Sequence, residues 1–163
     1  DYTIAARLEK GLPIFVPDDG QGMWTLTHVR DFAVGFAGLC GKQEAIGEAY
    51  HITSDMVLTW NQIIKEIAGA LGVKEYEVHK IPSEFICQKA PELDGRIIGD
   101  KACSAVFDCA KIKEIVPDFD CTISFRQGIK ESVKWFREDK SRQKINEESN
   151  QIFDKVINAW KNN

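Results

Sequence analysis

The apolar residues of this chain fall into short runs that alternate between the spacing of strands and the spacing of helices. Apolar or alternating runs bounded by turn residues predict strands at 12–16, 24–29, 49–53 and 76–81. Apolar residues three and four apart predict helices at 2–8, 31–41, 59–71, 84–89, 108–116, 122–136 and 145–160. The stretch 91–101 is predicted to be a loop. This pattern predicts an α/β fold, mostly helical with a few short strands.

Composition limits the class of protein further. The 163 residues are 44% hydrophobic and 28% charged, which is enough to form one globular core. No apolar run approaches the eighteen or so residues that a membrane span needs, and no signal-peptide pattern opens the chain. The net charge of -4 argues against a broad nucleic-acid footprint. Five cysteines with no CxxC pair indicate reduced thiols and a cytoplasmic protein.

A glycine pattern, GxxGxxG, occurs at Gly35, Gly38 and Gly41. Such glycines let a backbone approach a dinucleotide pyrophosphate when they directly follow a strand. Here they fall in the second half of the helix that Asp31 is expected to cap. Close helix packing, with Gly41 ending the helix, is therefore the favoured interpretation.

A second pattern, YxxxK, occurs at Tyr76 and Lys80. On a helix this spacing lets a lysine lower a tyrosine pKa for proton transfer. On a strand the two residues lie about 13 Å apart. Because the segment alternates as a strand does, we expect no catalytic pair there.

Metal ligands are not evident from the sequence. The histidines, His28, His51 and His79, are scattered, and no cysteine near them gives a zinc-site spacing. The acidic pair Asp18 and Asp19 resembles the start of a calcium loop, but the acidic residue that would close such a loop is absent. A turn explains this segment.

Several segments, taken in order, resemble the carboxyl-terminal part of the NAD-dependent epimerase/dehydratase family, which are extended short-chain dehydrogenases acting on nucleotide sugars. The segments are Gly11–Pro17 (GLPIFVP), Gly20–Gly22 (GQG), Trp24–Asp31 (WTLTHVRD), Gly47–Asp55 (GEAYHITSD), Leu58–Gln62 (LTWNQ), Phe107–Lys111 (FDCAK) and Gly128–Trp135 (GIKESVKW).

The resemblance implies a small substrate-binding lobe without the Rossmann half of that family. That half would hold NAD or NADP and the catalytic residues, so neither a cofactor-binding nor a catalytic residue is expected in this chain, and whether it is an enzyme stays uncertain. We expect a substrate-binding domain over 1–140 and a carboxyl-terminal amphipathic helix over 141–163. The chain is interpreted as a piece of a longer protein, and homo-oligomerisation is left open.

Four substrate-binding residues follow from the resemblance, position by position. Phe15 matches a strand residue that flanks the nucleobase, although an apolar strand residue also fits a core. Trp24 stands where the epimerases have a diphosphate-binding arginine, and an indole cannot neutralise a phosphate. Arg96 and Asp100 resemble a later pair that binds diphosphate and ribose, with solvated loop charges as the alternative.

The leading functional hypothesis is therefore the substrate-binding domain of an NAD-dependent epimerase/dehydratase acting on a nucleotide sugar or related polar substrate. Its expected partners are that substrate and the missing Rossmann half, and it would be inactive without that half. The alternative is a non-catalytic module from the same family that binds protein or RNA. The change at Trp24 leaves room for this alternative, whereas the acidic charge weighs against RNA.

Overall fold

The computed structural model describes residues 1–163 and has two small sheets among many helices. The strands are β1 (Ile14–Pro17), β2 (Met23–Thr25), β3 (Val57–Thr59) and β4 (Val78–Ile81). The helices are α1 (Thr3–Glu9), α2 (Val29–Leu39), α3 (Trp60–Leu71), α4 (Ser83–Lys89), α5 (Asp94–Arg96), α6 (Ala110–Ile115), α7 (Phe125–Glu138) and α8 (Glu147–Lys161). This confirms the predicted fold class, a small helical α/β lobe with few short strands.

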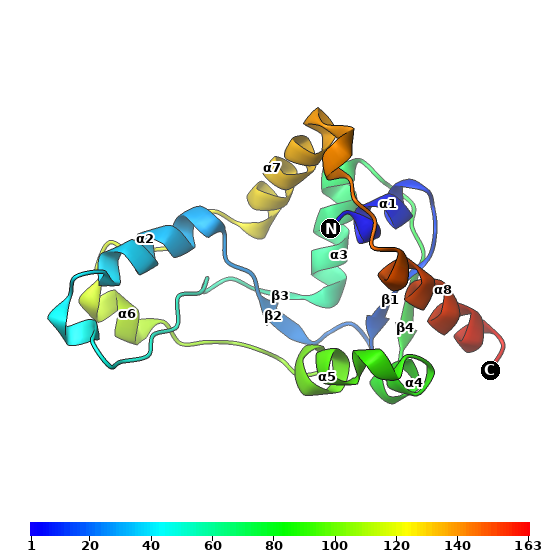
Figure 1. The fold of residues 1–163 in the computed structure, drawn as a ribbon, viewed down its shortest axis with the longest axis horizontal. Helices are drawn as coiled ribbons and strands as arrows, with labels where there is room; N and C mark the ends of the chain where they lie inside the picture. Colours follow the sequence, from blue (N-terminus) through cyan, green and yellow to red (C-terminus); the bar gives the residue numbers. More distant parts are fainter.

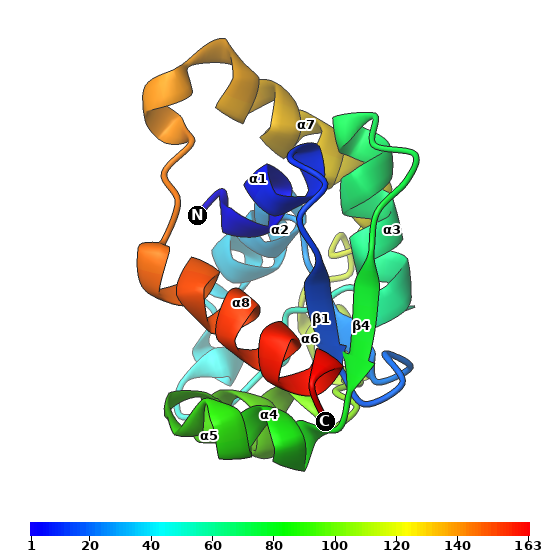
Figure 2. The same ribbon diagram turned by 90° about the vertical axis from the view of Figure 1, so that its right-hand side faces the viewer.

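The larger end of the molecule is built around the parallel pair of β1 and β4, in which Ile14 is the partner of Val78. Figure 2 shows these strands side by side with α8 beside them. One core cluster joins β1 to α1 and α3, and a second joins β4 to α4 and α8. β2 and β3 form a separate antiparallel pair.

Helices α2 and α6 lie together at the opposite end of the molecule (Figure 1). They have their own small core, in which Cys109, Ile112, Val116 and Phe119 are buried. The other face of α2 is apolar and open, with Val29, Phe32, Val34 and Phe36 exposed. The chain therefore has an end whose apolar residues are only partly covered.

A buried arginine connects the first and last helices. The Arg7 side chain is 1% exposed and donates hydrogen bonds to the Pro13 carbonyl (3.0 Å), the Asn150 side chain (2.6 Å) and the Asp154 carboxylate (2.6 Å). Its guanidinium also lies over the Phe153 ring, 5.1 Å from the ring centroid. Arg7 thus fixes α8 against α1 and against the turn that leads into β1.

Several local predictions are confirmed. The helix predicted over 59–71 is present as α3, which Thr59 caps in a capping box with Gln62 and which ends at Gly72 in the left-handed region at φ 79°. Gly35 and Gly38 lie inside α2, where an added Cβ would collide with Phe119 or Val116. Close packing against the α6 end therefore explains these two glycines.

Two predicted segments are wrong, and the strand predicted over 24–29 ends at Thr25 because α2 already begins at Val29. Residues 49–53 are not a strand, because no strand lies beside them and the Thr53 carbonyl accepts hydrogen bonds from the Cys109 and Cys121 thiols instead. Residues 91–101 are not a loop but successive helical turns that bury Ile97 in the second core cluster. Pro91 does not prevent these helical turns, because proline is compatible with a first helical turn.

One predicted helix cap also differs from the structure. His28, not Asp31, caps α2, and the Asp31 carboxylate instead accepts the backbone N–H of Ile123 at 3.0 Å. The helix predicted over 122–136 begins later, at Phe125, where Ser124 caps α7 through a capping box. Asp31 therefore joins α2 to the segment before α7, a tertiary role that a local pattern cannot reveal.

We predict that Arg7→Met lowers the free energy of unfolding by about 1–3 kcal/mol, because it removes the buried donor of the hydrogen bonds to Pro13, Asn150 and Asp154. Urea denaturation of this chain measures the effect. Lys155→Met, an exposed change on α8, is the control and should stay within about 0.5 kcal/mol of the wild type. Equal stability of the two variants would show that Arg7 does not hold α8 in place.

We also predict that Gly38→Ala destabilises the chain by about 1–3 kcal/mol through overpacking. Gly69→Ala in α3 is the matched control, since nothing lies within 4 Å of an added Cβ there. That control should stabilise the chain by about 0.5–1 kcal/mol through helix propensity. Thermal unfolding of both variants tests the packing role, which a stabilised Gly38→Ala would contradict.

Candidate functional site

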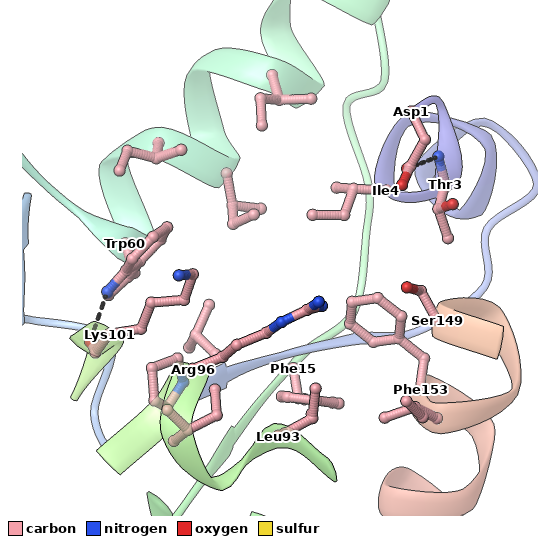
Figure 3. A pocket seen from close by; sticks show the side chains of 17 residues that line it. Asp1, Thr3, Ile4, Phe15, Trp60, Leu93, Arg96, Lys101, Ser149 and Phe153 are labelled. Atoms are coloured by element: carbon pink, nitrogen blue, oxygen red, sulfur yellow. Dashed lines mark hydrogen bonds between the residues drawn. The ribbon is translucent and has the colours of Figure 1, made fainter. Parts of the chain in front are cut away.

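A cavity of about 430 Å³ opens between β1, the start of α3, the turns around α5, and α8. This is within the usual size range of small-ligand pockets. Figure 3 shows its walls, which are mostly apolar. The lining residues are Asp1, Thr3, Ile4, Phe15, Val16, Pro17, Trp60, Ile63, Ile64, Ile67, Leu93, Arg96, Ile97, Lys101, Ser149, Ile152 and Phe153.

Two cationic side chains reach into this apolar cavity from the turns that hold α5 (Figure 3). Arg96 is exposed and makes no ion pair within the chain, whereas Lys101 pairs with Asp100 at 2.7 Å. A guanidinium presents several N–H donors in one plane, which suits a phosphate or carboxylate. Arg96 is therefore the cation available to an anionic ligand.

Aromatic rings border the cavity on two sides. Phe15 on β1 contacts Phe153 on α8, with ring centroids 4.8 Å apart. On the other side Trp60 stacks on Trp24, at 5.5 Å between centroids, and donates a hydrogen bond from Nε1 to the Lys101 carbonyl at 3.1 Å. The Lys101 ammonium lies 5.6 Å from the Trp24 ring centroid. Flat apolar surfaces beside cations suit a nucleobase with its phosphate.

The cavity has no catalytic arrangement of side chains. Its only carboxylate is Asp1, whose Oδ1 accepts a hydrogen bond from the Thr3 backbone. Residues 76–80 form no helix, so Tyr76 and Lys80 do not share a helical face. No group of three or more His, Cys, Asp or Glu residues in the chain is placed to hold a metal ion.

None of the cysteine thiols lines the cavity. All five cysteines are free, and burial raises the pKa of the Cys121 thiol to about 11, with the Asp31 carboxylate as a further cause. At neutral pH this thiol is protonated and a poor nucleophile. None of the helices combines the length and the apolar character required to cross a membrane.

Comparison with known proteins gives one curated relative and several similar structures. No protein-family model matches the chain. The chloroplast stem-loop binding protein of 41 kDa b from Arabidopsis thaliana is 38% identical over 80 residues, which are 48% of this chain and 21% of that protein.

The similar structures are sugar-nucleotide enzymes. UDP-glucose 4-epimerase from Thermotoga maritima covers 83% of this chain with a TM-score of 0.62 and 22% identity. UDP-glucuronic acid 4-epimerase from Bacillus cereus covers 84% of this chain with a TM-score of 0.64 and 16% identity. dTDP-glucose 4,6-dehydratase from Bacillus anthracis covers 85% of this chain with a TM-score of 0.63 and 18% identity. The chain has the fold of the NAD-dependent epimerase/dehydratase family.

Only part of the epimerase/dehydratase fold is present in these 163 residues. The chain spans 38% of each of the two epimerases, 39% of the dehydratase and 21% of the curated relative. Identities of 22% or less to the enzymes establish the fold and leave the ligand open.

The structure brings the four residues expected from the epimerase/dehydratase resemblance to one region. Phe15 and Arg96 line the cavity, Trp24 lies behind Trp60, and Asp100 is at the edge as the partner of Lys101. Sequence reasoning missed Trp60, Lys101 and Phe153 as lining residues.

The three missed residues differ in the signal that the sequence offered. Trp60 shares helical spacing with Ile63, Ile64 and Ile67, and this apolar face of α3 forms one wall of the cavity. Phe153 belongs to the apolar pattern of α8. Lys101 follows Asp100 directly, and no sequence pattern marks it as a residue that lines the cavity.

Proposed function

We propose that this chain is a non-catalytic nucleotide-binding lobe that recognises an RNA stem-loop. The observation that carries the proposal is the 38% identity over 80 residues to a protein named for stem-loop binding. The solved sugar-nucleotide enzymes reach 22% identity or less in the three comparisons above. A sequence identity of 38% is better support for a shared class of ligand than a similarity of fold alone.

The cavity supports this proposal through its chemistry. Proteins that read RNA loops stack unpaired bases on aromatic rings and hold phosphates with cations. Here Phe15 and Trp60 supply rings at the wall of the cavity, and Arg96 supplies a cation without a partner. We assign base stacking to Phe15, phosphate binding to Arg96, and positioning of Lys101 to Trp24 and Asp100.

The tryptophan at position 24 also supports the proposed RNA ligand over a nucleoside diphosphate. In the resemblance to the epimerases this position carries a diphosphate-binding arginine, and an indole cannot replace its charge. With one diphosphate ligand lost, a single phosphate beside a stacked base fits the cavity better. The acidic charge of the whole chain excludes a broad electrostatic footprint but not a local one.

The second candidate function is the substrate-binding lobe of an NAD-dependent enzyme acting on a nucleotide sugar. It is favoured by the Bacillus cereus epimerase, whose structure contains UDP-glucuronic acid and NAD. In that case NAD or NADP and the catalytic residues would come from a Rossmann half, and this chain alone would show no turnover.

The cellular compartment is also a proposal. The five free cysteines favour the cytoplasm, whereas the curated relative is named as chloroplastic.

We predict that this chain binds a fluorescein-labelled RNA stem-loop more tightly than a duplex of the same stem without the loop. Arg96→Ala should weaken stem-loop binding by about 1.5–3 kcal/mol, the value of a hydrogen bond to a charged group. Fluorescence anisotropy at a fixed salt concentration measures both affinities. Arg30→Ala, on α2 and paired with Glu131, is the control and should bind as the wild type does.

Calorimetry with UDP-glucose, UMP and NAD separates the two candidate functions. For the stem-loop function we expect UDP-glucose to bind no more tightly than UMP, and NAD not to bind. Micromolar binding of UDP-glucose that Arg96→Ala abolishes, without stem-loop binding, would establish the nucleotide-sugar function instead.

A further inference from the structure

Helix α7 carries a row of cations along the edge that faces α3. Arg126, Lys130, Lys134 and Arg137 succeed one another at intervals of three or four residues, which places them on one side of a helix. A shallow groove beside this row is lined by Ala70 of α3 and, on α7, by Lys130, Val133, Lys134, Arg137 and Glu138. The row spans twelve residues, 126–137, or about 16 Å of helix.

The ends of this row are neutralised and its middle is not. Arg126 forms two hydrogen bonds with Glu66, at 2.9 and 2.7 Å, and Arg137 pairs with Glu9 at 2.9 Å. Lys130 and Lys134 are exposed and form no ion pair within the chain. Two cations are therefore free between two that are fixed in place.

The surrounding charge is positive, in contrast to the chain as a whole. Between Arg126 and Lys144 there are seven basic and three acidic residues, a formal charge of +4, whereas the whole chain carries -4. The Arg126 hydrogen bonds, together with the charges of Lys65 and Lys130, hold the pKa of Glu66 below its ordinary value. An anionic partner would thus meet a local positive field here.

We propose that this α7 row binds the phosphate backbone of the stem, while the cavity beside Arg96 takes an unpaired nucleotide of the loop. The inference rests on the proposed stem-loop function. Each strand of a duplex presents a regular line of phosphate charges, so a row about 16 Å long can contact several of them. Lysines act as point charges on phosphates and read no sequence, which is what a stem contact requires.

The test compares Lys130→Gln/Lys134→Gln with Lys42→Gln/Lys155→Gln, a control pair with the same change in charge at exposed positions outside α7. Binding of a stem-loop and of a loop-free duplex RNA is measured between 50 and 200 mM salt, conditions under which phosphate contacts appear as a salt-dependent slope. We expect the α7 variant to lose roughly tenfold in affinity for both RNAs. The slope of log affinity against log salt concentration should decrease in magnitude by about 2. Arg96→Ala should lose affinity for the stem-loop alone.

The outcomes separate this inference from the function on which it rests. Unchanged affinity and slope in the α7 variant, with wild-type stem-loop binding intact, would overturn the α7 assignment only. Absence of RNA binding by the wild-type chain would overturn both. Preferential binding of a poly-glutamate peptide, lost in the same variant, would assign the row to an acidic protein partner and refute the RNA contact.

Discussion

The buried guanidinium of Arg7 is the contact on which the larger end of the molecule depends. Its donors satisfy acceptors on the turn before β1 and on α8, two segments separated by more than a hundred residues. A charge so deeply buried is tolerated only when its hydrogen bonds are made. The wall of the cavity formed by Phe15 and Phe153 is consequently set by a residue that does not line it.

Local sequence patterns predicted what local physics determines. The helix over 59–71 and most of the strand over 76–81 were predicted because each depends on a few adjacent residues. The stretch 49–53 has a strand-like composition, yet whether a strand forms depends on a partner that only tertiary structure supplies. The helical turns around Arg96 were missed for a similar reason, since burial of Ile97 outweighs the glycines on either side.

The site separates what depends on the fold from what depends on individual side chains. The family resemblance pointed to Phe15, Trp24, Arg96 and Asp100, and the structure brings these four residues into one region because fold and chain order fix where those positions lie; their part in binding stays a prediction. It could not reveal the Trp24–Trp60 stack or the Lys101–Asp100 pair, because these follow from side chains specific to this sequence. The Trp24 indole stands where the resemblance expects a cation, and it presents an aromatic surface beside the Lys101 ammonium.

The open face of α2 has a consequence for how the chain behaves in concentrated solution. Val29 is 71% and Phe36 57% exposed, and Phe32 stacks on Phe36 in the same stripe. An apolar stripe of this kind favours self-adhesion, opposed by a net charge of only -4. Solubility should therefore fall as pH approaches the isoelectric point near 5.4, where that repulsion vanishes while the stripe is unchanged.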